Sequence, residues 1–248
     1  MIHAMMRLGT LLLLLGLSAA WISAEALELD RRRMLNAEEH LAWRGVGRVN
    51  VASLTMLSMC TGTLIEEDLV LTAAHCVMNP LTGRAYRPES VHFVAGWRLG
   101  QEVAHRTAKA IAVHPGYRLT EHPEMEDIAA DLALIRLAEP IPSSLVPAFP
   151  IAPAPAKGTP LTLISYRQDR PHALTRQQGC DVLARKDALL TLGCDVASGA
   201  SGAPIFAVEG DRAQVVGVIS ARGSDGRRAL ALGVLIEAAI SEVMSALP

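Results

Sequence analysis

Ser201 lies in a segment whose residue types could present a nucleophile. Residues 195–204 read DVASGASGAP, so the Ser201 hydroxyl is flanked by Gly199 and Gly202. Small neighbours leave such a hydroxyl accessible, and a tight turn can aim the N–H groups of Gly199 and Ser201 at a developing oxyanion. Turns of Gly, Ser and Ala are also common on ordinary protein surfaces. The segment therefore indicates acyl-transfer chemistry only if a base and an orienting acid accompany it.

His75 and Asp131 lie upstream in settings that could supply that base and that acid. His75 follows the apolar run 69–74, and Asp131 opens the otherwise largely apolar run 131–137. Taken singly, the histidine would be a structural residue and the aspartate a turn or cap residue. Together with Ser201 they form a set that can activate a serine, because the imidazole accepts the hydroxyl proton and the carboxylate orients the ring.

The first 26 residues have the pattern of a secretory signal peptide. Arg7 supplies a positive charge, residues 8–17 form an apolar stretch, and residues 24–26 read Ala-Glu-Ala. The apolar stretch is shorter than the roughly 20 residues that a membrane-spanning helix needs. We therefore expect residues 1–26 to be removed and the mature chain to be exported, periplasmic or extracellular, and free of the membrane.

The four cysteines of an exported chain favour two disulfides over a metal site, because no close Cys-x-x-Cys pair is present. Of the three possible connectivities we favour the local one, Cys60 with Cys76 and Cys180 with Cys194. Each bridge would close a loop of roughly 15 residues and stabilise the fold by about 3 kcal/mol in the chain-entropy description.

Composition narrows the class of partner. The 248 residues are half hydrophobic and carry a net charge of -2, which is unlike the basic surface of a nucleic-acid binder. The histidines have no zinc-site spacing, and the acidic loop 121–127 lacks an ordered calcium-binding pattern. We expect no nucleic-acid partner, no metal and no cofactor.

The remaining sequence pattern is that of an all-β protein. From Val46 onward, short apolar runs alternate with turn signals, which indicates strands. Residues 139–160 contain seven prolines and form a connector, and residues 236–247 have the apolar spacing of a helix. We thus expect an N-terminal arm (27–44), a first β unit with His75 and Asp131 (45–138), the connector, and a second β unit with Ser201 and a terminal helix (161–248). The arm includes three arginines at 31–33, which could be a processing site; we favour a solvated arm.

Four short blocks resemble the signatures of trypsin/chymotrypsin-like serine peptidases, in that family's order His, Asp, Ser. They are CTGTLI (60–65), LTAAHC (71–76), DLALIRL (131–137) and GASGAP (199–204). The likeness is strongest to the secreted bacterial branch. It implies two packed six-stranded antiparallel β-barrels with a C-terminal α-helix, and an active site in the cleft between them.

The resemblance also implies a mechanism. The chain would be a secreted, monomeric, cofactor-free serine endopeptidase acting on polypeptides through an acyl-enzyme. Ser201 would attack, His75 would move the proton, and Asp131 would hold the imidazole. The N–H groups of Gly199 and Ser201 would form the oxyanion hole, and the Ser220 backbone would pair with an extended substrate. Ester hydrolysis on the same residues, or a catalytically silent peptidase-like binding module, are the alternatives.

The sequence departs from the animal members of this family at the N-terminus and beside the nucleophile. Ala200 stands where many of them have an aspartate that pairs with a new N-terminus, and no Ile-Val-Gly-Gly start is visible. We therefore hypothesise that activity needs no inserted N-terminal ammonium, and that signal removal suffices, with or without trimming of the arm.

Specificity is left open by three residues. Asp195, six residues before Ser201, could lie at the base of the S1 pocket and favour cleavage after Arg or Lys, or it could be a hydrogen-bonded structural carboxylate. Ile219 stands where glutamyl endopeptidase-like members carry a histidine, which counts against an acidic P1 residue. Arg222 nearby could restore that preference or narrow the pocket.

Overall fold

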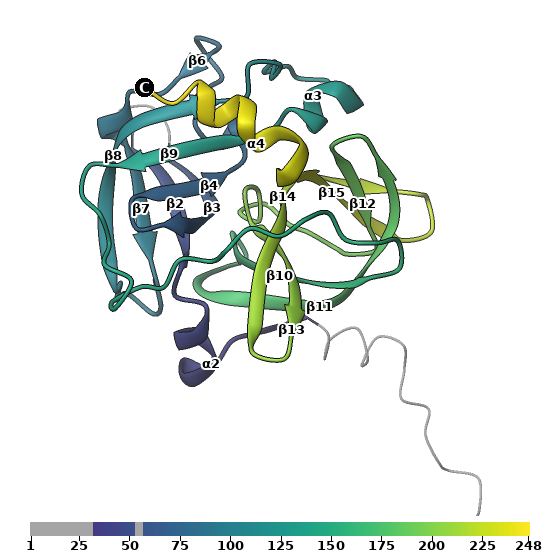
Figure 1. The fold of residues 1–248 in the computed structure, drawn as a ribbon, viewed down its shortest axis with the longest axis horizontal. Helices are drawn as coiled ribbons and strands as arrows, with labels where there is room; N and C mark the ends of the chain where they lie inside the picture. The colour runs from purple at the N-terminus through teal and green to yellow at the C-terminus, as the bar shows by residue number, and fades with distance from the viewer. Residues whose placement is uncertain (1–31, 53–56) are drawn as a thin grey trace, which may run out of the picture.

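The computed structural model describes residues 32–52 and 57–248. The predicted signal peptide and residues 27–31 of the arm lie outside the described residues. The strands of the described part form two ring-shaped sheets that lie side by side (Figure 1). All pairings between the named strands are antiparallel. No helix in this part of the chain is long and apolar enough to cross a membrane.

The first ring is a closed six-stranded barrel in the order β2-β3-β4-β9-β8-β7. Its strands are β2 (Val46–Ala52), β3 (Leu57–Glu66), β4 (Leu69–Thr72), β7 (Val91–Ala95), β8 (Ala104–Val113) and β9 (Ala133–Leu137). Large side chains such as Leu64, Phe93 and Leu134 are fully buried inside it. Burial of this apolar surface is the main force that closes the barrel. Between the strands lie the short elements η1 (Ala74–Cys76), β5 (Met78–Asn79), β6 (Arg84–Ala85), η2 (Pro88–Ser90) and α3 (Met125–Ala129).

The second ring also has six strands, closed by the pairing of β11 with β12. They are β10 (Pro160–Arg167), β11 (Arg170–Lys186), β12 (Leu189–Leu192), β13 (Pro204–Glu209), β14 (Arg212–Ser224) and β15 (Ala229–Leu235). Its own core contains Leu163, Leu192 and Ile205. The predicted all-β fold of two six-stranded antiparallel barrels is therefore confirmed.

Residues 32–44 of the N-terminal arm pack on the protein instead of being solvated. β1 (Arg32–Met34) adds to the outer edge of β11, and Leu35 is buried, with its N–H donating to the Leu174 carbonyl at 2.9 Å. α2 (Ala37–Ala42) follows, capped by Asn36, whose side chain accepts from the Glu39 N–H. The arginine-rich composition predicted solvation, but edge pairing satisfies the strand backbone and a single leucine anchors the turn that follows.

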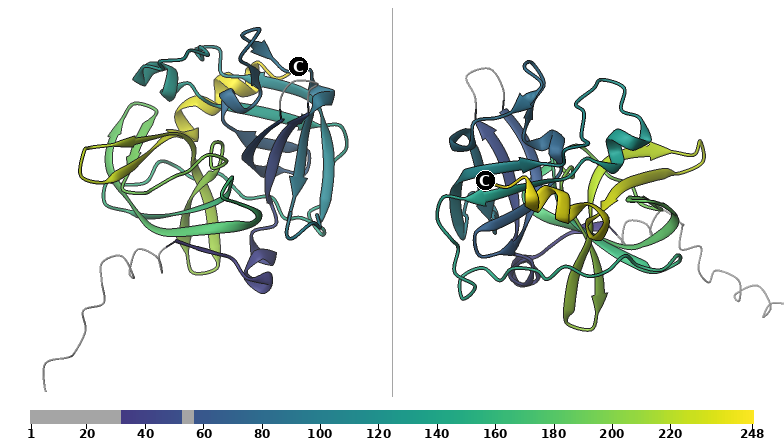
Figure 2. Two further views of the ribbon diagram at one scale, coloured as in Figure 1. Left: turned by 180° about the vertical axis from the view of Figure 1, so that it is seen from behind. Right: turned by 45° about the horizontal axis from the view of Figure 1, so that its top comes forward.

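Two segments tie the rings together. In the connector, the Phe149 N–H donates to the Leu64 carbonyl of the first ring at 2.9 Å, and the Val215 N–H of the second ring donates to the Pro150 carbonyl at 2.8 Å. The terminal helix α4 (Ile236–Ser245) begins directly after β15 and buries Ile236 and two further apolar residues. It contacts β8 and β9, so it lies against the first ring (Figure 2).

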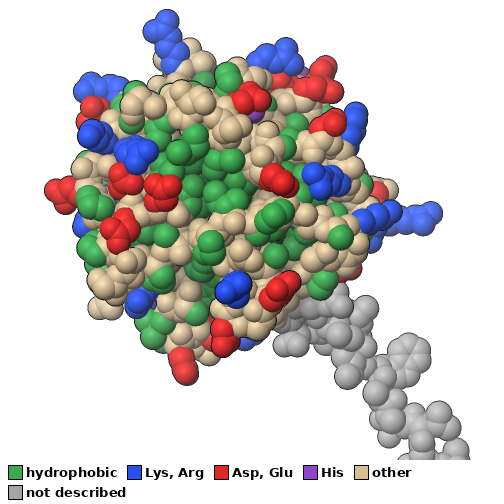
Figure 3. Space-filling view, viewed as in Figure 1, with side chains coloured by type: hydrophobic (Ala, Val, Ile, Leu, Met, Phe, Trp, Pro, Cys, Tyr) green, Lys and Arg blue, Asp and Glu red, His purple; other side chains and the backbone are tan. Residues whose placement is uncertain are grey.

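The structure contains both predicted disulfides. Cys60 of β3 is bonded to Cys76 of η1, and Cys180 of β11 is bonded to Cys194. The first bridge fixes the turn that carries His75 to the barrel wall, and the second lies beside the turn that carries Ser201. On the face drawn in Figure 3, Lys and Arg side chains are interspersed with Asp and Glu.

Candidate active site

The pairing of β4 with β9 brings His75 and Asp131 together. These strands are antiparallel, with Thr72 opposite Ala133. The residues that follow β4 therefore lie beside the residues that precede β9. His75 comes three positions after Thr72, on the single turn η1, and Asp131 comes two positions before Ala133. Two segments far apart in the sequence thus converge because of strand register.

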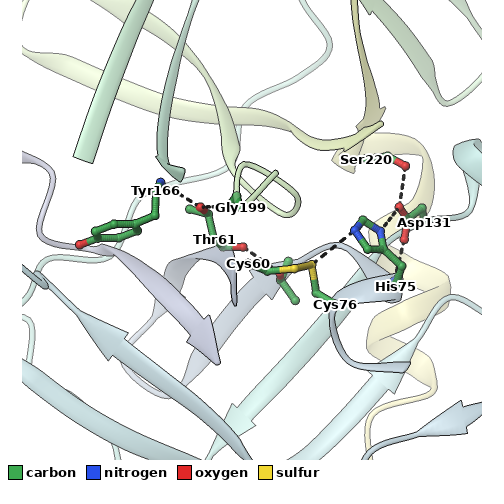
Figure 4. Close-up of a disulfide and its surroundings, with 9 residues drawn as sticks. Cys60, Thr61, His75, Cys76, Asp131, Tyr166, Gly199 and Ser220 are labelled. Atoms are coloured by element: carbon green, nitrogen blue, oxygen red, sulfur yellow. Dashed lines mark hydrogen bonds and ion pairs between the residues drawn. A yellow bond between two sulfur atoms is a disulfide. The ribbon is translucent and has the colours of Figure 1, made fainter. Parts of the chain in front are cut away.

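The Asp131 carboxylate accepts three hydrogen bonds (Figure 4). His75 donates to it twice, from its backbone N–H to Oδ1 at 2.9 Å and from its ring Nδ1 to Oδ2 at 2.7 Å. The Ser220 hydroxyl donates to Oδ2 at 2.5 Å. Since a carboxylate can only accept, the ring contact requires a proton on Nδ1 and leaves Nε2 with its lone pair. This is the tautomer that a general base needs.

The surroundings of His75 act on its pKa in opposite directions. Burial of the ring disfavours the imidazolium, while the charge of Asp131 and its hydrogen bond favour it, and the second effect prevails, so the pKa of His75 is raised. Asp131 is only 5% exposed, whereas the His75 side chain is 31% exposed. The pair therefore has a shielded acid and a base that can still reach a substrate.

Ser201 lies in the turn between β12 and β13, where two glycines have left-handed backbone angles. φ is +93° at Gly199 and +76° at Gly202. A Cβ at Gly202 would approach the Thr61 carbonyl oxygen and the Thr72 hydroxyl to 2.2 Å each. The positive φ of residue 202 and its close contact with the first ring therefore both require glycine at this position.

The peptide groups of this turn are oriented by hydrogen bonds from outside it. The Ser198 carbonyl accepts from the Gln168 N–H at 2.8 Å. In a trans peptide the C=O and the following N–H point in opposite directions, so the Gly199 N–H points away from Gln168. The Gly199 carbonyl in turn accepts from the Thr61 hydroxyl at 2.8 Å (Figure 4).

Two N–H groups of the turn stay without an acceptor. The N–H groups of Ala200, Gly202 and Ala203 donate to backbone carbonyls. Within residues 32–52 and 57–248, those of Gly199 and Ser201 donate to none. These two are the donors that the sequence predicted for an oxyanion hole.

Ser201 and His75 line two adjoining cavities. Ser201 lines a first cavity and His75 a second, and the two cavities share Ser220 and Ala221. Among the described residues no hydrogen bond joins Ser201 Oγ to the ring, and His75 Nε2 lies 3.8 Å from Cys76 Sγ (Figure 4). Catalytic hydrogen bonds are often long before substrate binds, so this geometry is compatible with a working pair.

His75 also lies close to the two sulfurs of the Cys60–Cys76 bridge, an arrangement that could suggest a metal site. Both sulfurs are in the disulfide, however, and metal ions bind the thiolate form of cysteine. The cluster is therefore an anchored histidine and not a set of metal ligands.

The three residues predicted to bind substrate, Asp195, Ser220 and Arg222, do not all line one cavity. Ser220 and Arg222 line the first cavity, together with Ser201. Asp195 is not among its lining residues, and its carboxylate forms an ion pair with Arg32 of β1. Of the two roles considered for Asp195, the structure favours the structural carboxylate.

Sequence reasoning missed the role of the Ser220 hydroxyl and two further residues near the site. The Ser220 hydroxyl reaches Asp131 at an irregularity in the pairing of β14 with β15, between Ile219 and Ala221. Bulges of this kind re-aim a side chain, and no sequence signal marked this one. Tyr117 and Ile128 line the second cavity from the loop around α3. That loop is acidic in composition, so its few apolar residues form no pattern that would mark them in the sequence.

Comparisons with known proteins agree with the fold. A family model for the trypsin-like peptidase domain matches residues 60–218. The chain is 33% identical over 93 residues to the modular serine protease of Drosophila melanogaster, covering 35% of this chain and 14% of that protein. It is 32% identical over 88 residues to the venom peptide isomerase heavy chain of Agelenopsis aperta, covering 34% of this chain and 32% of that one. The match thus spans less than a third of the length of either relative.

Solved structures match over most of the chain. A Glu endopeptidase superposes with a TM-score of 0.68 at 22% identity, covering 86% of this chain and 93% of that one. The protease Anisep of Arthrobacter nicotinovorans gives 0.66 at 16% identity, covering 86% and 99%. At these identities the likeness shows the fold alone. Because the family model spans well over half of its residues, the chain belongs to the family of trypsin-like peptidase domains.

Proposed function

We propose that this protein is an exported serine endopeptidase that cleaves polypeptides through His75, Asp131 and Ser201. One observation carries the proposal. The Asp131 carboxylate holds the His75 ring through Nδ1, which leaves Nε2 of the neutral ring free to accept a proton, and the cavity lined by His75 adjoins the cavity lined by Ser201. Family membership and the two disulfides support it, since disulfides persist in oxidising compartments.

The proposed reaction begins when Ser201 Oγ bonds to the scissile carbonyl carbon and its proton passes to His75 Nε2. The carbonyl oxygen becomes an oxyanion that accepts from the N–H groups of Gly199 and Ser201, each worth about 3 to 4 kcal/mol in comparable sites. Collapse of this intermediate breaks the C–N bond, and the leaving amine takes the proton from His75. Water then attacks the acyl-enzyme by the same steps and frees Ser201.

The free edge of β14 supports binding of an extended substrate. β13 pairs with β14 only from Arg212 to Val218, so beyond Ile219 one edge of β14 lacks a partner strand among the described residues. Ser220 begins this open edge. A substrate strand added there would place its scissile bond near Ser201, in the manner of β-strand addition.

We further propose that no inserted N-terminal ammonium is needed. In this chain the Ser198–Gly199 peptide is oriented by the backbone of Gln168, and the arm is held by strand pairing. These internal contacts hold the oxyanion donors in place without a cleaved N-terminus.

Labelling with a fluorophosphonate probe tests the proposal. The disulfide-bonded mature protein should be modified at Ser201 and should hydrolyse peptides, whereas Ser201→Ala should do neither. Ser198→Ala is the matched control, because Ser198 lines the same cavity without serving as nucleophile. Absence of labelling in folded protein would favour a silent binding module. If Ser201 is labelled and the protein hydrolyses esters but not peptides, the result would favour an esterase.

A further inference from the structure

The cavity beside Ser201 is lined by eight residues, of which one is charged. Its lining residues are Val196, Ala197, Ser198, Ser201 and the run from Ile219 to Arg222. Arg222 is the charged member. A side chain that enters this cavity therefore meets seven neutral residues and one cationic residue.

Arg222 has no counter-ion in the described part of the chain. It is exposed, and it forms neither an ion pair nor a side-chain hydrogen bond with residues 32–52 or 57–248. The nearest acid in its own hairpin, Asp225, already accepts from the side chain of Arg228 and from two backbone N–H groups. The guanidinium is thus available to a ligand.

The acid that could have given the cavity the opposite preference is occupied. Asp195 directly precedes the cavity wall at Val196, but its carboxylate is paired with Arg32 from the N-terminal arm. A basic substrate side chain would have to displace Arg32 and lie beside Arg222. Both effects disfavour Lys or Arg in this cavity.

The size of the cavity suits a side chain of moderate length. Its volume is about 140 Å³. A cavity of roughly 150 Å³ admits a benzene-sized group, so a Glu or Asp side chain fits.

We propose that Arg222 binds the carboxylate of the residue preceding the scissile bond, which makes peptides with Glu or Asp at P1 the substrate class. This inference rests on the proposed peptidase function. A guanidinium can bind a carboxylate through two parallel N–H···O bonds, which an amide of the same shape cannot match.

The test uses peptides that differ only at P1, with Glu, Gln, Leu and Arg. The wild-type kcat/KM for Glu should exceed that for Gln by about 10- to 100-fold, the range that a hydrogen bond to a charged group gives. The Arg peptide should be the poorest. In Arg222→Gln the Glu-to-Gln ratio should fall to about one, and Arg222→Lys should restore part of it.

Arg227→Gln is the matched control, because it removes the same charge from the same hairpin outside the cavity and should keep the wild-type ratio. A wild-type ratio near one, or a ratio that survives Arg222→Gln, overturns the inference. Fluorophosphonate labelling distinguishes failure of this inference from failure of the proposed peptidase function. If Ser201 is labelled but the ratio is one, the substrate class is wrong; if Ser201 is not labelled, the proposed function itself fails.

Discussion

Ser220 contributes to the site through two different groups. Its backbone opens the free edge of β14, and its hydroxyl donates to the same Asp131 oxygen that binds the His75 ring. The hydroxyl therefore helps to hold the carboxylate against the imidazole ring. This makes Ser220 a positioning residue as well as part of the substrate-binding strand.

Ser220→Ala separates these two roles. The backbone edge remains, so KM should change little, whereas the loss of one hydrogen bond to a buried charge should lower kcat by about 10-fold. Steady-state kinetics measure the split, with Ser224→Ala on the exposed end of the same strand as control. An unchanged kcat would show that the hydroxyl does not position Asp131.

The raised pKa of His75 predicts the acid limb of the pH profile. Only the neutral ring can accept a proton, so kcat/KM should fall as the pH drops through the His75 pKa, at a pH above the ordinary 6.5. In Asp131→Asn the attraction is lost and burial remains, so the midpoint should move down. NMR titration of the His75 ring measures both midpoints, and a wild-type value below 6.5 would contradict the argument.

The same shift means that protonated His75 stabilises the fold below about pH 6.5, and that this contribution is lost as the pH rises through its folded pKa.

At the scale of elements, the N-terminal strand takes part in shaping the site. Arg32 on β1 lies opposite Gln177 on β11, and both hold Asp195: Arg32 pairs with its carboxylate, and the Gln177 amide, with its nitrogen toward the carbonyl, bonds the Asp195 backbone oxygen at 2.7 Å. Asp195 leads directly into the cavity wall. The arm therefore steadies the segment that precedes Ser201.

Exchange of the two charges tests this clamp. Arg32→Asp and Asp195→Arg should each lower kcat/KM severalfold without unfolding the protein. Each single variant places two charges of the same sign next to each other at positions 32 and 195. The double variant should recover part of the loss. Arg33→Gln is the control. Arg33 lies on the same strand as Arg32, but its charge is paired with Glu39 of α2. Full activity after removal of residues 32 and 33 by cleavage would contradict the clamp.

How much of each element could be predicted depends on its pattern. β4, β9 and α4 were recognised because dense or periodic apolar residues mark them. β11 cannot be predicted in this way, because it is long, rich in polar residues and interrupted by register shifts with both neighbours. The short β1 cannot be predicted either, because its arginines resemble a solvated segment. The contacts that orient Asp195 and Asp131 join residues 163 and 89 positions apart, and local pattern cannot specify them.

At the scale of the whole molecule, the candidate site exists only when the two rings are docked. The first ring supplies His75 and Asp131, and the second supplies Ser201 and Ser220. The two rings approach each other closely at Gly202, whose neighbours are Thr61 and Thr72 of the first ring. The docking surface and the candidate active site are therefore the same place.

Gly202→Ala should disturb both stability and labelling. Its Cβ would clash with backbone and hydroxyl atoms, so we expect a loss of about 3 kcal/mol or more in the free energy of unfolding, together with loss of fluorophosphonate reactivity. Gly210→Ala is the control, because Gly210 also has a positive φ but nothing lies within 4 Å of an added Cβ. It should cost only about 1 kcal/mol from backbone strain and leave labelling intact. Chemical denaturation with parallel labelling gives both readouts, and equal costs at the two positions would contradict the docking argument.

The bond from the Gln168 N–H to the Ser198 carbonyl has a consequence for how this site can vary among related sequences. The donor is a backbone group, which every residue except proline provides. The orientation of the Gly199 peptide is thus insulated from almost every substitution at position 168. A contact of this kind can persist while the side chain at position 168 changes, because the bond depends on a backbone group that all amino acids but proline provide.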